Sequence, residues 1–508
     1  MNKRAKLSRI VASVIFVLAF TGCSSDTTVT DESNKDFELK KLGSYSSGVE
    51  NGSEISAYDS VSKRVFITNG ATNKIDIIDI QDLSSPQFIS SIDLSSYGTG
   101  VNSVAVSNEK VAVAVEDGNA TVGEKQLKGK VVLFDTDGNF IKSIEVGYLP
   151  DMVTFNEDGT KIIVANEGEP NDDYSIDPIG SIGVIAVADG SYVDINFSNA
   201  TLTDAHDGTK VRLGETPSND KAKDLEPEYI TVQGDYAYVT LQENNAIAKV
   251  NLTNNTLEFV KSLGAKSYES GSGNTIDIEE NGEIEMKSFD GLFALYQPDA
   301  IASYVVDGQT YLVTANEGDG REYGDFEDAK KIKKLDLADA IKSNFEDDND
   351  LKVMVDLGKN SDGKYEKLYA FGARSFSIWD ANGDLVWDSG DLISKKVAEL
   401  QPELFNQDDG EMDGRSGNKG VEPEGVTLGK VNEKIYAFIG LERQNVIMVW
   451  DITNLNKPIF KDYIDTGKDG DISPEGMKFI EASKSPNGKN MLIVSYEMSG
   501  TTVFYEVK

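Results

Sequence analysis

The sequence predicts an all-β fold, a β-propeller of eight, or alternatively seven, four-stranded blades with short helical insertions. Short runs of β-branched and aromatic residues recur at intervals of roughly 45 to 80 residues, a period typical of propeller blades. Most runs follow another such run across a turn rich in Gly, Asn and Asp, as antiparallel strands do. The eight runs begin at Val65, Val111, Lys161, Tyr236, Thr310, Leu368, Ile435 and Met491. The run at Leu368 is the weakest, and seven blades result if it belongs to a neighbouring unit.

The two ends of the β-rich part of the chain are expected to meet in one blade. Residues 37–47 would supply the outer strand of the last blade, which ends at residues 502–505, and this pairing closes the ring. Insertions interrupt the repeat, and two contain helix-like stretches, at residues 335–345 and 392–404, which are interpreted as caps on the ring. The insertions span residues 169–180, 203–224, 268–289, 319–350 and 394–420.

Composition restricts the functions that this chain can perform. Its 508 residues are 39% hydrophobic and 9% aromatic and include only 12 prolines, which suits a folded protein with a large core. The 86 acidic residues outnumber the 49 basic ones, and the net charge of -37 argues against nucleic acid as a partner. One histidine and one cysteine exclude disulfide frameworks, zinc sites of Cys and His, and His-based triads. Divalent cations are therefore the expected partners.

The first 22 residues have the pattern of an export signal. Four basic residues precede an apolar stretch over residues 10–20, which Thr21-Gly22-Cys23 follows. A lone cysteine at this place is typical of bacterial lipoproteins, so Cys23 is expected to carry a lipid that anchors the chain to a membrane. The alternative is an ordinary secretory signal. Residues 23–36 would then form a flexible tether, and residues 37–508 a single propeller domain at the outer membrane or cell surface.

An acidic residue follows a proline where the first strand of five units begins. The tripeptides are Leu149-Pro150-Asp151, Glu226-Pro227-Glu228, Gln297-Pro298-Asp299, Glu422-Pro423-Glu424 and Ser473-Pro474-Glu475. A sheet tolerates proline at the first position of a strand, so the prolines by themselves have a structural explanation. The carboxylates do not, because the first strand of a blade lines a crowded channel where like charges repel. A positive charge is expected beside them.

A second acidic set ends the second strand of the same kind of unit. Its members are Glu116, Glu167, Glu243, Glu317, Glu442 and Glu497. In an up-and-down blade the first strand begins and the second ends on one face, so both sets are expected at one mouth of the channel. Carboxylates and backbone carbonyls without His or Cys favour calcium, which takes six to eight oxygen ligands. Both sets, Glu116 apart, are the expected calcium ligands, and a solvated acidic rim is the alternative.

Four arginines accompany the acids at the ends of the blades. They are Arg321, Arg374, Arg415 and Arg443. Guanidinium groups there would neutralise the carboxylates or hold a phosphate beside the metal through paired hydrogen bonds, and ion pairing is the favoured interpretation. The other interpretation predicts a phosphatase in which two or more calcium ions, bridged by acids that include Glu317, activate water. In that enzyme Arg321 or Arg374 would stabilise the departing phosphate.

Several strings resemble the choice-of-anchor I family of bacterial surface proteins, which is similar to mesenchyme-specific cell-surface glycoproteins. The strings are residues 147–152 (GYLPDM), 165–170 (ANEGEP), 314–319 (TANEGD) with 321–323 (REY), 372–379 (GARSFSIW) and 418–425 (NKGVEPEG). The resemblance covers residues 37–508 and implies a propeller held at the cell surface by varied anchors. Some relatives carry an alkaline-phosphatase label. The iron-using phosphatases among similar propellers need a cysteine ligand, which this chain lacks once Cys23 is lipidated.

Two functions therefore stand as hypotheses, and the first is favoured. The first is a surface module that holds calcium at its acidic mouth and, through the metal, an anionic partner such as a mineral, a phosphate polymer or a glycan. The second is a calcium-dependent phosphomonoesterase that acts on phosphate esters. An enzyme needs metal ions held close to each other and to an attacking water, whereas a binding module does not.

Overall fold

The computed structural model describes residues 37–119, 123–346 and 349–508, and residues 37–508 form one compact unit. The export signal, the lipidated Cys23 and the tether predicted for residues 1–36 lie outside the described residues. Within them, the chain forms eight sheets of four or five strands, joined by turns and a few short helices. The fold is all-β, as the sequence predicts.

Seven of these sheets are blades, in which each strand is antiparallel to the next. The first blade contains β2 (Ser56–Asp59), β3 (Arg64–Asn69), β4 (Lys74–Asp79) and β5 (Gln87–Asp93). The second contains β6 (Gly100–Ser107), β7 (Lys110–Asn119), β8 (Gly123–Asp135) and β9 (Phe140–Tyr148). The third contains β10 (Pro150–Phe155), β11 (Lys161–Asn166), β12 (Ser181–Ala186) and β13 (Tyr192–Asn196). The fourth contains β15 (Ile230–Gln233), β16 (Tyr236–Leu241), β17 (Ala246–Asn251) and β18 (Thr256–Ser262), and the short strand β14 (Leu202–Thr203) pairs with β18 in parallel. The fifth contains β21 (Ile301–Val306), β22 (Gln309–Asn316), β28 (Ser375–Asp380) and β29 (Leu385–Asp388). The sixth contains β30 (Pro423–Val431), β31 (Lys434–Leu441), β32 (Val446–Asp451) and β33 (Ile459–Asp465). The seventh contains β34 (Pro474–Ile480), β35 (Met491–Tyr496), β36 (Thr501–Val507) and β1 (Leu39–Ser46).

The first strands of the seven blades contact one another in a closed order and form the wall of a central channel. Strand β2 contacts β6, β6 contacts β10, β10 contacts β15, β15 contacts β21, β21 contacts β30, β30 contacts β34, and β34 contacts β2. The second strand of each blade is buried between neighbouring sheets, and Met491–Tyr496 is buried at all of its positions. Because these strands are covered on both faces, they read as nearly continuous apolar runs in the sequence.

The eighth sheet is assembled from short strands of the insertions. It contains β19 (Ala265–Ser267), β20 (Leu292–Leu295), β27 (Leu368–Ala370), β26 (Lys352–Met354) and β25 (Ala329–Lys331). Strands β20 and β27 are parallel, unlike the four main strands of each blade. The weak run at Leu368 therefore lies in this sheet, while β28 and β29 complete the blade that β21 begins. Of the eight described sheets, seven form the ring, which is the alternative that the sequence left open.

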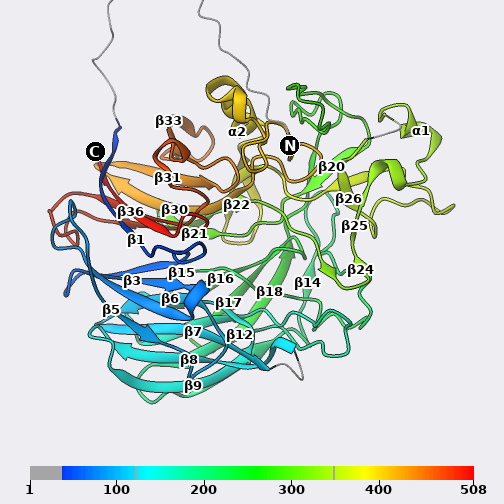
Figure 1. The fold of residues 1–508 in the computed structure, drawn as a ribbon. Helices are drawn as coiled ribbons and strands as arrows, with labels where there is room; N and C mark the ends of the chain where they lie inside the picture. Colours follow the sequence, from blue (N-terminus) through cyan, green and yellow to red (C-terminus); the bar gives the residue numbers. More distant parts are fainter. Residues whose placement is uncertain (1–36, 120–122, 347–348) are drawn as a thin grey trace, which may run out of the picture. The chain divides into compact units, whose positions relative to one another are not determined.

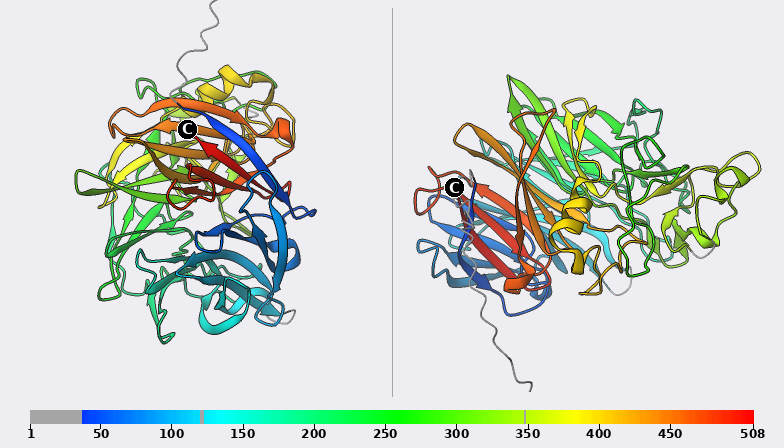
Figure 2. Two further views of the ribbon diagram at one scale, coloured as in Figure 1. Left: turned by 90° about the vertical axis from the view of Figure 1, so that its left-hand side faces the viewer. Right: turned by 90° about the horizontal axis from the view of Figure 1, so that it is seen from above.

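The outer strand of the last blade comes from the beginning of the described chain. Leu39 pairs with Val507 and Ser46 with Thr501, so β1 is antiparallel to β36. Figure 1 shows the blue strand β1 beside the red β36, and Figure 2 shows the same strands from two further sides. Phe37 is buried against Tyr436, with ring centroids 4.9 Å apart. The predicted closure of the ring by residues 37–47 is confirmed.

Helices are short and belong to the insertions or to turns. The helical elements are α1 (Asp339–Lys342), α2 (Leu392–Leu400) and the 3-10 turns η1 (Gly70–Thr72), η2 (Ile332–Lys334), η3 (Pro402–Leu404) and η4 (Gly467–Asp469), and β23 (Glu322–Tyr323) pairs with β24 (Phe326–Glu327) in a hairpin. Helix α2 packs Ile393 and Val397 against the apolar core of two blades, so it caps the ring as predicted. The helix expected at residues 335–345 is shorter and spans only α1. Among the helices of the described chain, none is long and apolar enough to cross a membrane.

Candidate cation site at the channel mouth

A β-bulge places an acidic residue at the start of several first strands. In β10, Pro150 pairs with Asn166 and Met152 with Ala165, so Asp151 between them has no partner in the ladder. Strands β30 and β34 shift register in the same way at Glu424 and Glu475. A bulge of this kind redirects a side chain, and bulges are frequent beside functional sites. In the proline-containing tripeptides of the sequence, the bulge therefore directs the carboxylate that follows the proline toward the channel.

The residue before four of the prolines takes an unfavourable backbone conformation. The φ angles are 44° at Leu149, 46° at Gln297, 45° at Glu422 and 65° at Ser473. A side chain at such positive φ costs about 1–3 kcal/mol, and a following proline restricts the backbone further. Backbone strain of this size persists only where the surrounding structure holds it, and it is common at functional sites. Its recurrence in four blades shows that the position of the following acid is tightly specified.

Two blades provide the same position without a proline. The carbonyl of Ile55 accepts the Thr68 amide, as the carbonyl of Tyr229 accepts the Thr240 amide, so Glu54 corresponds to Glu228. In β6 the register shifts between Val101 and Ser103, which places Asn102 at the bulge. We call this set the first ring: Glu54, Asn102, Asp151, Glu228, Asp299, Glu424 and Glu475. Sequence reasoning missed Glu54 because it followed the prolines; strand register would have found it.

The acids that end the second strands, which we call the second ring, lie at the same mouth. Its members are Glu116, Glu167, Glu243, Glu317, Glu442 and Glu497. Burial raises the pKa of Glu475, and the charges of Glu54 and Glu497 raise it further. Asp299 and Glu442, from two more blades, act on the same carboxyl group. Acids that are far apart in the sequence therefore face one another across the channel.

Burial and mutual repulsion raise the pKa values of many acids in the two rings. The pKa of Glu54 is raised to about 8, and those of Glu243 and Glu317 to about 7, with burial as the largest cause. The same cause, together with neighbouring carboxylates, raises the pKa well above its usual range in a further group. Its members are Glu167, Glu228, Asp299, Glu424 and Glu475. Without a cation, the charged forms of these groups are strongly disfavoured.

Three carboxylates come close enough to share one ion. One oxygen each of Asp299, Glu317 and Glu424 lies within 4.8 Å of the others, and Glu422 and Glu442 form a second such group with Glu317. In the two rings as the structure describes them, four acids each have one buried carboxylate oxygen without a hydrogen-bond partner. These acids are Glu228, Glu243, Glu424 and Glu475. A buried oxygen without a partner is costly, and a donor set made only of oxygen suits calcium.

One cation of the protein already reaches into the acidic mouth. The Lys419 Nζ lies 2.5 Å from an oxygen of Glu317 and 3.4 Å from Asp319. Glu422 is fully buried and lies 2.6 Å from Arg415 and 3.7 Å from Arg443. Sequence reasoning missed Lys419, although it stands in the string of residues 418–425. The structure thus favours ion pairing as the role of Arg415 and Arg443.

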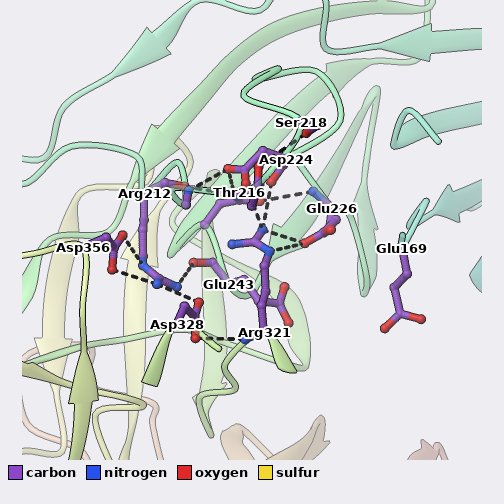
Figure 3. Close-up of polar contacts among 12 residues, drawn as sticks. Glu169, Arg212, Thr216, Ser218, Asp224, Glu226, Glu243, Arg321, Asp328 and Asp356 are labelled. Atoms are coloured by element: carbon purple, nitrogen blue, oxygen red, sulfur yellow. Dashed lines mark hydrogen bonds and ion pairs between the residues drawn. The ribbon is translucent and has the colours of Figure 1, made fainter. Parts of the chain in front are cut away.

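Arg321 is buried by contacts with other insertions. Its guanidinium donates to Glu226 Oε2, with the shorter bond at 2.6 Å, and to the carbonyl of Asp224 at 2.9 Å (Figure 3). Arg212 lies nearby, 2.7 Å from Asp328 and 2.9 Å from Asp356. These pairs link the insertion that follows β14 to the one that follows β22. The side chain proposed to stabilise a departing phosphate is therefore engaged within the protein.

Arg374 also has internal partners. Its two terminal nitrogens donate to the carbonyl oxygens of Asp277, Ser416 and Asn418, each at 2.8 Å. The residue is 3% exposed and has a left-handed backbone, with φ of 52°. These three hydrogen bonds connect Arg374 to the loop of Asp277 and to the loop of Ser416 and Asn418. Of the residues predicted to be catalytic, Glu317 is itself a member of the second ring, and Arg321 lies close enough to Glu243 for its charge to act on that carboxyl group.

Above the rings lies an open cavity of about 430 Å³ with charges of both signs. Glu243 and Asp319 line it together with Tyr323, and Lys419 and Arg443 form another part of the wall. The insertions thus surround the acidic mouth instead of closing it. A metal bound by the rings would face a cavity in which cationic side chains are also present.

Comparison with known families identifies the chain. The model of the choice-of-anchor I domain matches residues 54–455. The chain belongs to the choice-of-anchor I family. The matched range contains six of the seven first-ring residues, and Glu475 of the last blade lies beyond it.

Individual relatives share less of the chain. It is 28% identical over 343 residues to the mesenchyme-specific cell surface glycoprotein of Strongylocentrotus purpuratus, which covers 58% of this chain and 42% of that protein. It is 25% identical over 181 residues to Gigasin-3a of Magallana gigas, covering 31% of this chain and 64% of the relative. This choice-of-anchor I chain thus matches less than two thirds of the length of either curated relative.

Solved structures resemble the fold at low sequence identity. Hydrazine synthase of Kuenenia stuttgartiensis matches with a TM-score of 0.47 and 12% identity, over 91% of this chain and 99% of that one. The β-propeller domain of Cps50 (Swd1) from Myceliophteria thermophila matches with a TM-score of 0.46 and 7% identity, over 93% and 100% of the two chains. A streptogramin B lyase matches with a TM-score of 0.44 and 13% identity, over 93% and 98%.

Proposed function

We propose that this choice-of-anchor I protein binds calcium at the acidic mouth of its channel. The observation that supports the proposal is the convergence of carboxylates from six blades, several of which keep a buried oxygen without a partner among the described residues. Like charges this close need a counter-charge, and a divalent ion supplies it while satisfying several oxygens at once. The group of Asp299, Glu317 and Glu424 is the expected centre of the site.

Calcium fits this donor set better than the other common metal ions. The chain has a single histidine, and His206 lies on an exposed loop away from the rings, beside Asp384. Zinc and copper prefer nitrogen and sulfur ligands, whereas magnesium demands a compact octahedron and keeps much of its water. Calcium accepts six to eight oxygens in a flexible arrangement, which suits rings built from many blades.

We further propose that the protein works outside the cell, anchored through Cys23, and holds an anionic partner through the bound metal. One relative is named a cell surface glycoprotein, and the first residues have the pattern of a lipoprotein signal. Lys419 and Arg443 line the cavity over the rings and would attract the anionic groups of a mineral, phosphate polymer or glycan.

The experiment compares two variants of one blade. Glu424→Gln removes a first-ring charge, and Glu433→Gln removes a charge whose side chain is 95% exposed, in the turn after β30. Calcium is titrated into chelator-treated protein by calorimetry, and the melting temperature is measured alongside. We expect calcium to stabilise the wild type, by about 2.7 kcal/mol at a hundredfold excess over Kd. Glu424→Gln should weaken binding at least tenfold while Glu433→Gln leaves it unchanged. Equal affinities in the two variants, or no effect of calcium on the wild type, would refute the site.

The phosphomonoesterase remains a second hypothesis with its own test. It relies on Glu317 near the metal, while Arg321 and Arg374 have internal partners. Turnover of p-nitrophenyl phosphate is measured with calcium and with chelator, in the wild type and in Glu317→Gln. Calcium-dependent turnover that is lost in the variant supports the enzyme. Absence of chelator-sensitive turnover on a panel of phosphate esters rules it out and leaves the binding function.

A further inference from the structure

The same three acidic motifs occur twice in the ring, two blades apart. In the fifth and sixth blades they are residues 298–299 (PD), 315–318 (ANEG) and 422–424 (EPE). In the third and fourth blades they are residues 150–151 (PD), 165–168 (ANEG) and 226–228 (EPE). The acids of the later copy, which we call the primary triplet, are the expected centre of the calcium site: Asp299, Glu317 and Glu424. The corresponding acids of the earlier copy, which we call the second triplet, are Asp151, Glu167 and Glu228.

Both copies are built in the same way. Asn166, the residue before Glu167, pairs with Ser181 on the next strand and donates a hydrogen bond to its hydroxyl at 3.2 Å. Asn316 pairs with Ser375 and donates the equivalent bond at 3.1 Å. The glycine after the acid has a positive φ in both copies, 80° in one and 91° in the other. Strand β10 contacts β15 as β21 contacts β30, so each triplet spans two neighbouring blades.

Glu228 in the second triplet shares a feature with Glu424 in the primary triplet. It is 9% exposed, and one of its carboxylate oxygens is buried without a hydrogen-bond partner in the described part of the chain. Burial raises its pKa, and the other two acids of its triplet, Glu167 and Asp151, are among the carboxylates that raise it further. A buried carboxylate oxygen that faces other acids requires a cation or a proton.

The two triplets differ in the cation that the protein itself supplies. Lys419 lies beside Glu317, and its charge opposes the rise in the pKa values of Glu317 and Asp299. The charges that act most strongly on Glu167 and Glu228 all belong to carboxylates. The second triplet therefore depends on a cation from solution, whereas the chain already neutralises part of the primary triplet.

We propose that the second triplet binds a calcium ion of its own, about tenfold more tightly than the primary triplet does. The donor set of one aspartate and two glutamates is the same in both, and it suits calcium for the same reason. The affinities differ because a bound ion displaces Lys419 from the primary triplet alone. This inference rests on the proposed calcium function, but the triplets share no residue, so each can lose its ion while the other keeps it.

The test counts the calcium ions and resolves their affinities. Chelator-treated protein is titrated with calcium by calorimetry, and equilibrium dialysis gives the number of ions bound per chain. We expect the wild type to bind at least two ions in separate steps. Glu167→Gln should abolish the tighter step, and the matched variant Glu317→Gln should abolish the weaker one. Glu424→Gln should affect the weaker step alone, and the exposed control Glu433→Gln should leave both unchanged.

Lys419→Gln gives a separate readout of the difference in affinity. It should tighten the weaker step about tenfold and leave the tighter step unchanged, so that the two steps merge. The proposed order of affinities is overturned if Glu167→Gln loses the weaker step instead of the tighter one.

Two measurements separate loss of a ligand from loss of the fold. Glu167→Gln removes a buried charge that other acids repel, so its melting temperature in chelator should be no lower than that of the wild type. Asp151→Asn removes a second ligand of the same triplet and should abolish the same step. If the wild type binds calcium and both of these variants keep every step, the second site is overturned and the primary site stands. If the wild type binds no calcium, both proposals fail. If Glu317→Gln keeps every step while Glu167→Gln loses one, the primary site fails and the second stands.

Discussion

Lys419 is the residue on which the state of the acidic mouth depends most directly. Its ammonium group lies beside Glu317 and within reach of Asp319, so it occupies part of the space where a metal would sit. A cation tied to the chain neutralises one carboxylate in the absence of metal. When calcium binds, the same ammonium group is repelled from the site and can turn to the cavity above.

Replacing Lys419 is therefore expected to have opposite effects on stability and on calcium affinity. Lys419→Gln should lower the melting temperature of the metal-free protein, because the carboxylate of Glu317, whose side chain is only 12% exposed, loses its ion-pair partner. The same change should tighten calcium binding about tenfold, equivalent to about 1.4 kcal/mol, because no internal cation competes. Calorimetry and thermal unfolding measure both quantities.

The control for this prediction is Lys430→Gln near the end of β30. Lys430 lies 3.4 Å from the exposed Glu433, and its own side chain is 57% exposed. It should change neither quantity, because exposed ion pairs contribute little. Weaker calcium binding in Lys419→Gln would show that the lysine supports the site instead of competing for it.

At the scale of single elements, the first strands combine two tasks. Their beginnings carry a bulge that directs an acid into the channel, and their continuations line a cavity inside the ring of blades. In four of these strands the residue before the proline has a positive φ and lies between the strand and the loop that precedes it. An acid at this position is thus held by the backbone itself and not by a long, flexible connection.

Strand β1 is the element that closes the ring, and its removal should be costly. A chain that begins at residue 48 lacks β1 and Phe37 and leaves β36 as an exposed edge strand. It also loses the burial of Phe37, which contributes roughly 1.5–3 kcal/mol, and of Leu39 and Tyr45 in part. We expect the melting temperature to fall by roughly 3–6 °C, because about 1 kcal/mol of lost stability lowers it by about 1 °C in a unit of this size.

The matched control is a chain that begins at residue 37, which keeps β1 complete. Thermal unfolding followed by circular dichroism should give it the melting temperature of the chain that begins at Cys23. If the chain that begins at residue 48 unfolds at that temperature as well, β1 does not hold the ring closed.

At the scale of the whole molecule, part of the net charge of -37 opposes folding, because acids of the two rings are buried and repel one another. The raised pKa values of Glu54, Glu243 and Glu317 mean that the folded, metal-free protein binds more protons near neutral pH than the unfolded chain. The free energy of unfolding therefore decreases as pH rises and these groups lose their protons. A metal ion reverses this by stabilising the charged forms.

The pH dependence of stability follows with a definite sign. In chelator, the free energy of unfolding should fall as pH rises from about 4.5, the usual carboxyl pKa, to about 8, the raised pKa of Glu54. The total loss should reach a few kcal/mol. With saturating calcium the decrease should be much smaller. Urea unfolding at several pH values, with and without calcium, measures both curves, and rising stability in chelator over this range would contradict the account.

The sequence by itself determined the all-β propeller, the closure of the ring by its first described strand, and two acidic sets at one channel mouth. These features follow from local patterns, because strand periodicity and strand order decide which ends of the strands lie together. The sequence could also find the acids that follow a proline. It could not reveal Glu54, whose equivalence to Glu228 rests on hydrogen-bonding register.

Only the tertiary structure decided which partners the charged side chains have. Lys419 reaches Glu317, Arg321 reaches Glu226, and the run at Leu368 joins a sheet outside the ring. Each of these contacts involves an insertion, and insertions have no repeat from which a position can be inferred. A buried charge selects its partner by distance in space, which the spacing of residues along the chain does not determine.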